Sequence, residues 1–157
     1  MRTILKATAA IIGIALIAMQ FIARPHRVNP VEDHRVALSS RLHVPDSVQA
    51  ILDRSCNDCH SHRTVWPWYS AVAPVSWFVA HDVEEGRRHL NFSEWGTYPV
   101  KRQAAKLEMI SAEVDKGDMP VRAYVLMHGQ AALSEADKDM LCDWAADASD
   151  SLMGRGH

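Results

Sequence analysis

The chain has 157 residues, of which 48% are hydrophobic and 23% are charged, enough for one modest domain plus an anchor or tail but not for a second large domain. Residues 1–45 contain 6 basic and 2 acidic residues, which leaves 11 basic and 17 acidic residues in the rest of the chain. The globular part is therefore acidic, which argues against a protein that binds nucleic acid.

The N-terminus, residues 1–23, has the composition of a membrane anchor. Arg2 and Lys6 precede a nearly unbroken apolar run that is about as long as the shortest helix able to span a bilayer. No convincing small-x-small cleavage site follows, so we predict an uncleaved signal anchor rather than a cleaved signal peptide. The basic residues would stay in the cytoplasm, which predicts a single-pass inner-membrane protein with its later residues in the periplasm.

Residues 24–45 contain several prolines and little sustained periodicity, which is typical of a linker. A short helix over residues 31–42 is compatible with the spacing of the apolar residues there. We expect the linker to let the following domain, residues 46–150, swing relative to the membrane. The last residues, 151–157, are expected to form a tail.

The domain is predicted to open with a helix that begins at Asp46, directly after Pro45. Gln49 lies three residues after Asp46, as in a capping box, and an apolar run with helical periodicity follows. This helix leads into Cys56, so the motif described next lies at its C-terminal end.

Cys56, Cys59 and His60 have the CxxCH spacing that attaches a c-type haem. Two thiols one helical turn apart can reach the vinyl groups on one edge of a porphyrin, and the adjacent imidazole can ligate the iron. A zinc half-site would need further ligands, and the only other cysteine, Cys142, is distant and unpaired. A redox dithiol would be expected beside strands, which the surrounding pattern lacks. We predict one covalent haem c, with Cys142 a small hydrophobe packed on the last helix.

Residues 65–74 are rich in tryptophan and proline and cannot form a regular helix. We expect Trp66 and Trp68 to wall the haem, because a flat apolar cofactor needs aromatic surfaces that exclude water. The alternative is that these side chains simply fill a small protein core.

Three further helices are predicted from apolar periodicity and from their end signals. They cover residues 75–85, between Pro74 and Gly86; residues 99–116, before Gly117; and a final stretch from about Ser134, with Asp137 three residues on. The first carries an apolar stripe that we expect to be buried: Val75, Phe78, Val79 and Val83. Since no alternating strand pattern exceeds four residues, the predicted fold is all-α. It is a small c-type cytochrome-like helical domain with long aromatic-rich loops, preceded by one transmembrane helix.

Met119 is the predicted distal ligand of the iron, because it follows a helix end, precedes Pro120, and offers a thioether on a rigid loop. His62 is too close to His60 to reach across the ring. The remaining histidine candidates for the distal position are His81, His89 and His128. An open distal position is the third possibility.

Arg87 and Arg88 directly follow Gly86. A guanidinium at this turn could pair with a haem propionate, which is a carboxylate. Equally, the two arginines could form a solvated pair.

Several blocks of the sequence occur together: Cys56-x-x-Cys59-His60-Ser61, Trp66-Pro67-Trp68-Tyr69-Ser70, Ala73-Pro74-Val75-Ser76-Trp77, Gly86-Arg87, Asn91-Phe92-Ser93-Glu94-Trp95 and Met119-Pro120. Together they resemble the bacterial haem-binding domain family of membrane-anchored, CxxCH-containing proteins. The resemblance implies a single c-type haem on Cys56 and Cys59, with His60 as the proximal ligand. It also supports Met119 as the distal ligand.

The expected function is one-electron transfer by a membrane-tethered periplasmic monohaem cytochrome, which is a carrier rather than an enzyme. Its partner would be a redox protein, and an acidic surface favours a basic one. The alternative is a haem-based sensor, or a module that binds a small ligand or peroxide at an open or displaceable distal site, with His81 or His128 as the distal acid or base. A haem that serves only as a structural plug is the third hypothesis.

Overall fold

The computed structural model describes residues 1–22 and 25–154 of the chain. Across these residues the secondary structure is helical, with α-helices and short 3-10 helices and no strand. The predicted all-α class is therefore confirmed. Residues 23, 24 and 155–157 lie outside the described residues, and with them the predicted boundary between anchor and linker and the end of the predicted tail.

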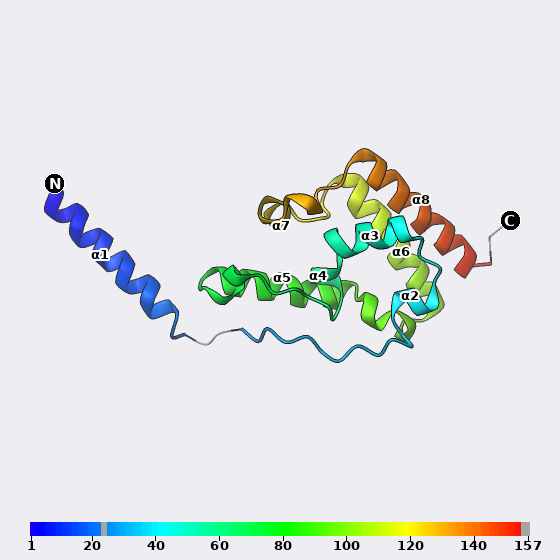
Figure 1. Ribbon diagram of the computed structural model, residues 1–157, viewed down its shortest axis with the longest axis horizontal. Helices are drawn as coiled ribbons and strands as arrows, with labels where there is room; N and C mark the ends of the chain where they lie inside the picture. Colours follow the sequence, from blue (N-terminus) through cyan, green and yellow to red (C-terminus); the bar gives the residue numbers. More distant parts are fainter. Residues whose placement is uncertain (23–24, 155–157) are drawn as a thin grey trace.

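Helix α1, Arg2–Met19, projects away from the rest of the chain (Figure 1). None of its residues is buried, and it is long and apolar enough to cross a membrane. Its 18 residues correspond to about 27 Å at 1.5 Å per residue, close to the thickness of a bilayer's hydrocarbon core. The expected N-terminal apolar helix is therefore present.

Residues 25–45 follow the outside of the domain and contain only the short helix α2, Leu38–Arg41, rather than a helix over 31–42 (Figure 1). They are fastened to the domain by hydrogen bonds. Asn29 Nδ2 donates to the carbonyl of Thr64 at 2.8 Å, and Ser93 Oγ donates to Glu32 Oε1 at 2.7 Å. The structure therefore gives no support to the free swinging that the composition of this segment suggests.

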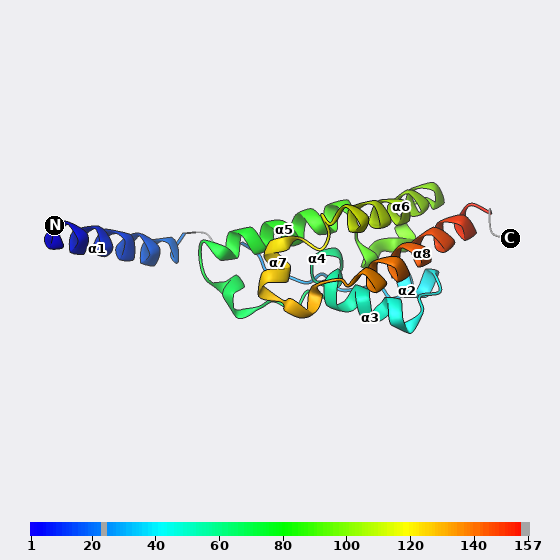
Figure 2. The same ribbon diagram turned by 90° about the horizontal axis from the view of Figure 1, so that it is seen from above.

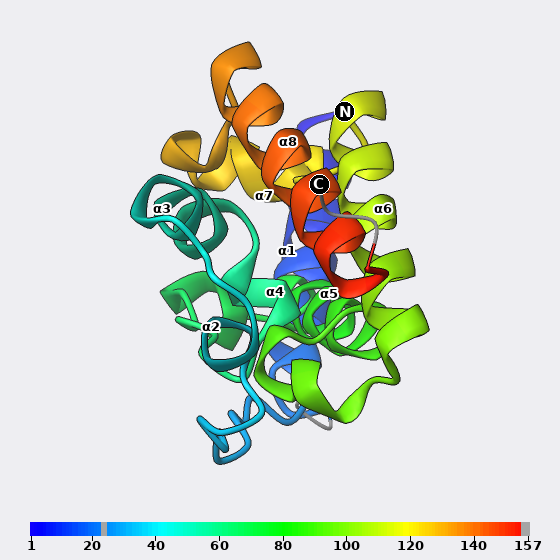
Figure 3. The same ribbon diagram turned by 90° about the vertical axis from the view of Figure 1, so that its right-hand side faces the viewer.

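The core lies between three helices, α3, Asp46–Ser55; α6, Val100–Lys116; and α8, Glu135–Leu152 (Figure 3). Each buries one apolar stripe with helical periodicity, as the sequence predicts. The buried side chains include Ile51, Leu52, Leu107, Ile110, Val114, Leu141 and Trp144. Phe92 and Trp95 from η2, Phe92–Thr97, also belong to this core. Gly117 ends α6 with φ +77°, a left-handed conformation that suits glycine.

A second layer carries the cysteine motif. Helix α4, Asn57–His60, packs beside α5, Val75–His89, while η1, Trp68–Ala71, precedes α5 (Figure 2). Helix α7, Arg122–Met127, which the sequence did not predict, lies across from α5 and leads into η3, Gly129–Ala131.

Helix α5 differs from its prediction in two respects. It continues through Gly86 to His89, so this glycine does not end the helix. Its predicted apolar stripe is also largely uncovered, because Val83 is buried while Val75 and Phe78 are exposed. Periodicity identified an apolar face, but only its C-terminal part, at Val83, is buried.

The start of α8 makes stability depend on pH. Ser134 and Asp137 form a complete capping box, and Arg54 Nη2 lies 2.7 Å from Asp137 Oδ2. The hydrogen bonds from Ser134, followed by that from Arg54, lower the pKa of Asp137 to about 2. A carboxylate with a depressed pKa stabilises the fold above its unfolded pKa of about 3.9 and loses that contribution as the pH falls through the native value.

We therefore expect the melting temperature of the protein to fall as the pH drops from about 4 to about 2, and Asp137→Asn to flatten this part of the profile. Thermal unfolding followed by circular dichroism measures it. Ser134→Ala is expected to flatten the profile only in part, because it removes the Oγ hydrogen bond, at a cost of about 1 kcal/mol, but keeps the Ser134 N–H bond and the pair with Arg54. An unchanged pH profile in Asp137→Asn would contradict the assignment.

Candidate functional site

A cavity of about 360 Å³ lies between two walls of the domain, one formed by α4 and α5 and the other by α6, α7 and the segment that joins them. This volume lies in the range of small-molecule and cofactor sites. The residues that carry its chemistry are Cys56, Cys59, His60, Asp82, Glu85, His89, Met109, Glu113, Met119 and Tyr124. Leu90, Phe92, Ile110, Val114 and Leu133 supply apolar lining.

Both cysteines of the motif line this cavity as free thiols. Burial is the main reason that the pKa of Cys56 and the pKa of Cys59 rise to about 12. Redox-active dithiols instead have a lowered pKa, because the thiolate is the nucleophile. In the described part of the chain, no three His, Cys, Asp or Glu side chains converge as a metal site, so the zinc interpretation lacks ligands.

The ring of His60 is oriented by the backbone of α5. Its Nδ1 lies 3.0 Å from the carbonyl oxygen of Gly86 and 3.0 Å from that of Leu90. Since carbonyls only accept, we assign the proton to Nδ1, which leaves Nε2 with a free lone pair. Burial lowers the pKa of His60, which favours this neutral form. A hydrogen-bonded Nδ1 and an unprotonated Nε2 are the arrangement of a histidine that ligates a metal.

Gly86 brings the two helices of this wall together. A Cβ atom at this position would lie 2.6 Å from the carbonyl oxygen of Cys59 and 3.0 Å from its Cβ. Any side chain would therefore push α5 away from α4. The absence of one lets the Gly86 carbonyl reach His60 while both thiols stay on the cavity side.

Two thioethers, Met109 on α6 and Met119 after α6, line the cavity on the wall opposite α4 and α5. The backbone of Met119 is fixed, because its N–H donates to the carbonyl of Glu113 at 3.1 Å. The sequence singled out Met119 but not Met109. A methionine in the middle of a helix carries no signal that separates a ligand from core filler.

The three histidines predicted as possible distal ligands differ in where they lie relative to the cavity. His81 is exposed and lines neither cavity, and His128 lines a second cavity. His89 does line the main cavity, but it comes from α5, on the same wall as His60, and its Nε2 lies 3.5 Å from Glu85 Oε2. Of the predicted distal ligands, Met119 alone combines a place on the cavity with a place on the opposite wall.

The aromatic residues at the cavity are not the predicted ones. Neither Trp66 nor Trp68 lines it, and Trp68 is 78% exposed. Phe92 and Tyr124 take that place, with the Phe92 ring 6.2 Å from that of His60. Loop composition identified an aromatic block, but which aromatic residues reach the cavity depends on how α7 and η2 fold back, which is a tertiary effect.

The guanidinium of Arg87, which the sequence predicts as a partner of a haem propionate, makes its hydrogen bonds elsewhere in this structure. It donates to the carbonyls of Ser61 and Val28 and to the side chains of Asn29 and Thr64, at 2.8–3.0 Å. Arg87 thus clamps the linker to the motif and has no donor directed at the cavity. The neighbouring Arg88 pairs with Glu85.

The described cavity lining contains three carboxylates, Asp82, Glu85 and Glu113, and no lysine or arginine. Acidic groups bound there, such as propionates, would be repelled from these positions. An anionic edge of a bound group would therefore point to solvent, away from the carboxylates.

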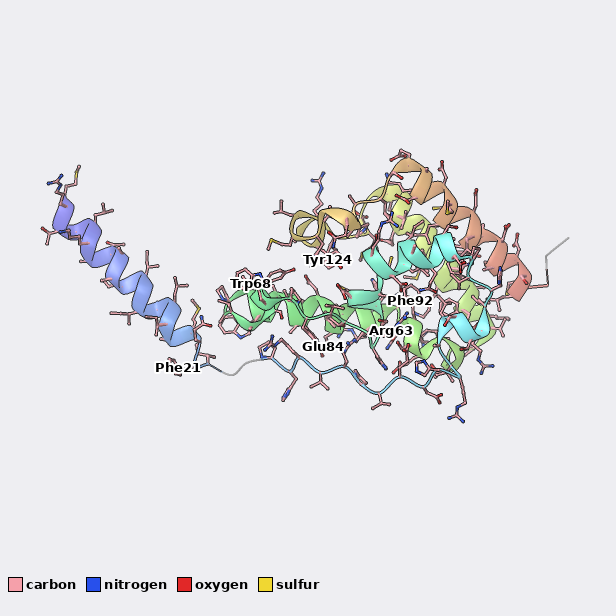
Figure 4. The ribbon with its side chains drawn as sticks, viewed as in Figure 1. Phe21, Arg63, Trp68, Glu84, Phe92 and Tyr124 are labelled. Carbon is pink, nitrogen blue, oxygen red and sulfur yellow. The ribbon has the colours of Figure 1, made fainter. Side chains whose placement is uncertain are left out.

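Tyr124 connects the two walls, since it lies on the side of α7 that faces α4 (Figure 4). Its hydroxyl donates to Asp58 Oδ2 at 2.7 Å, and its ring stacks on His128 at 4.2 Å between centroids. Burial, with this hydrogen bond, raises the pKa of Tyr124, so the phenol stays protonated and remains a donor.

Tyr124→Phe is expected to lower the free energy of unfolding by about 1–2 kcal/mol, because the Asp58 carboxylate loses a charge-assisted hydrogen bond. Urea denaturation measures the change. Tyr69→Phe is the matched control, since its hydroxyl lies at a longer 3.3 Å from Nε2 of His128 instead of a carboxylate. Equal decreases in the free energy of unfolding of the two variants would show that the hydrogen bond to Asp58 contributes no more than the contact with His128.

Two thiols, an oriented imidazole and a thioether on an apolar cavity form a donor set that fits an iron porphyrin. The fold and the site thus define a small helical haem protein. A sequence profile of the haem-binding domain family matches residues 14–147, most of the chain, and the protein belongs to that family. No curated protein and no solved structure shows significant similarity to the chain.

Proposed function

We propose that the protein is a monohaem c-type cytochrome that transfers one electron at a time and carries its haem on thioether bonds from Cys56 and Cys59. The observation that carries the proposal is the meeting of both thiols, His60 and Met119 on one cavity. A haem held there supplies an iron centre that gains or loses one electron. His60 would be the proximal ligand through Nε2, and Met119 the distal ligand.

The chain's own residues suit electron transfer because hydrogen bonds to the backbone hold the proposed ligands in place. His60 is fixed by two backbone carbonyls, and Met119 by the bond to Glu113. Leu90, Phe92 and Leu133 give the cavity an apolar lining that would disfavour water beside a bound haem. Ligands held in place between redox states need little rearrangement, and the partner that fits an acidic domain is a redox protein with a basic docking face.

The proposed location is the periplasmic side of the inner membrane, with α1 as a single-pass anchor. Arg2 and Lys6 lie at the start of α1, and positive charges stay on the cytoplasmic side. Thioether attachment of haem outside the cytoplasm is consistent with this orientation.

The test uses the full chain produced together with cytochrome maturation machinery. A pyridine haemochrome spectrum of the c type and a low-spin oxidised spectrum are expected, and Cys59→Ser should shift the haemochrome band toward that of a haem with one thioether. Absence of covalent haem from the unchanged protein would overturn the proposal. Cys142→Ser is the control, because Cys142 lies outside the cavity.

A second candidate function, a sensor or small-ligand module, is favoured by one observation. Met119 is 36% exposed and lies on a connecting segment, so an incoming ligand could displace it. Titration of the reduced protein with carbon monoxide distinguishes the two: slow and weak binding supports the carrier, whereas rapid binding at micromolar ligand supports the sensor.

A further inference from the structure

The end of the domain that lies nearest α1 exposes an unusual amount of apolar surface. Seven large side chains form this apolar tip: Val65, Trp68, Val72, Val75, Phe78, Leu126 and Met127. They come from the loop before α5, from the first turns of α5 and from α7. Phe78 is 67% exposed and Leu126 is 84% exposed. Contiguous apolar surface of this kind marks an interaction site on a soluble domain.

More than half of the tip residues meet at one place. A second cavity, of about 180 Å³, is lined by four of its members, Val65, Val75, Phe78 and Met127. None of the seven side chains lines the haem cavity, and three of them, Trp68, Val72 and Leu126, line neither cavity. These three are exposed apolar surface that an interaction partner can cover.

Four polar side chains of this second cavity are already paired with one another. The hydroxyl of Tyr124 donates to Asp58, and the hydroxyl of Tyr69 lies 3.3 Å from Nε2 of His128. Apart from Cys59 and Asp82, what remains for an occupant is apolar side-chain surface. This suits hydrocarbon better than a polar ligand.

The end of α1 is fastened to the tip by two hydrogen bonds. Gln20, the residue after α1, donates through Nε2 to the carbonyl of Ala73 at 3.0 Å, and the N–H of Ala73 donates to Gln20 Oε1 at 3.0 Å. Ala73 lies between Val72 and Val75 of the tip. In Figure 4 Trp68 is at the same end of the domain as Phe21, which follows this contact.

This connection fixes where the tip lies once α1 spans a bilayer. The span ends near Met19, so the groups that contact Gln20 stand at the boundary between headgroups and hydrocarbon. Tryptophan and tyrosine concentrate at that boundary, and Trp68 and Tyr69 are both at the tip. Arg27, which donates to Ser70 Oγ at 3.2 Å, adds a cation within reach of lipid phosphates.

We propose that the apolar tip rests in the surface of the same phospholipid bilayer that α1 spans, with Trp68, Phe78 and Leu126 inserted below the headgroups. The inference rests on the proposed single-pass anchoring. It adds that the domain has a fixed orientation on the membrane instead of swinging on its linker. The haem cavity, which shares Cys59 and Tyr124 with the second cavity, is then held close to the lipid surface.

The experiment uses the full, haem-loaded chain in lipid nanodiscs of phosphatidylethanolamine and phosphatidylglycerol, at one chain per disc. A fluorophore is attached to a single introduced cysteine in a Cys142→Ser background, in the variants Trp68→Cys, Phe78→Cys and Leu126→Cys. The control is Val100→Cys, which is also exposed but lies at the start of α6, at the far end of the domain (Figure 2). Haemochrome spectra verify that each variant carries haem.

Lipids with a nitroxide high on the acyl chain then report contact with hydrocarbon. Labels at 68, 78 and 126 are expected to be quenched roughly threefold more than the label at 100. Equal quenching at all four positions would overturn the proposal, and so would a tip that is protected only when a second copy is added. A chain that fails to co-purify with the discs would instead refute the anchoring, which keeps the two outcomes distinct.

Discussion

Gly86→Ala is expected to damage the haem site more than any other exchange of a single small residue in the chain. The new Cβ would lie 2.6 Å from the Cys59 carbonyl oxygen, a backbone atom that cannot move aside without shifting α4. Relief of such overpacking costs about 1–3 kcal/mol of the free energy of unfolding. Because His60 Nδ1 bonds the carbonyl of Gly86, displacement of α5 also loosens the imidazole.

Two measurements follow from this. The melting temperature of Gly86→Ala should fall, and its oxidised spectrum should show a smaller low-spin fraction than that of the unchanged protein. Gly129→Ala is the matched control, since a Cβ there meets no atom within 4 Å. If Gly86→Ala retained both the melting temperature and the spectrum, the close approach of α5 to α4 would not matter for the site.

Gly86 also shows where sequence reasoning reaches its limit. Its position after an apolar run made it a plausible helix end, and only the arrangement in space shows that α5 continues and uses the missing side chain for a contact with α4. A contact between residues 27 positions apart leaves no local signal in the sequence. The signals that did predict structure were local: the Ser134 capping box and the left-handed Gly117.

The same distinction holds for the site. The CxxCH spacing is local, and Cys56, Cys59 and His60 do line one cavity. The walls of the cavity are built from residues far apart in the sequence. The aromatic residues that line it are therefore Phe92 and Tyr124, and not the expected Trp66 and Trp68. An exposed tryptophan cannot be told from a buried one by composition alone. Trp68 matters instead for the surface that faces α1.

Orientation on the membrane would affect how the protein exchanges electrons. A domain fixed by its tip and by the linker contacts of Arg87 presents one side to diffusing partners. The rate of transfer would then depend on where the haem edge points, and less on the reach of a flexible tether. Arg87 and the tip would thus both determine how the domain is oriented on the membrane.

Met119→Ala is expected to remove the distal ligand and to give the second large effect. The methionine–iron charge-transfer band of the oxidised protein should disappear, and the spectrum should become high-spin. Loss of a methionine ligand, which raises the potential of a haem iron, should lower the reduction potential by roughly 100 mV or more, because axial ligands set potentials over a range of about 0.8 V.

Met109→Leu is the control that distinguishes between the two methionines as ligands. Both methionines line the cavity, and both come from the wall opposite His60, so proximity to the cavity does not distinguish them. Leucine preserves the volume of Met109 on α6 but cannot ligate iron. Survival of the band in Met109→Leu and its loss in Met119→Ala assign the ligand to the loop. Loss of the band in Met109→Leu and its survival in Met119→Ala would instead assign the ligand to Met109 on α6. The ligand would then not be Met119, whose backbone N–H bonds to the carbonyl of Glu113.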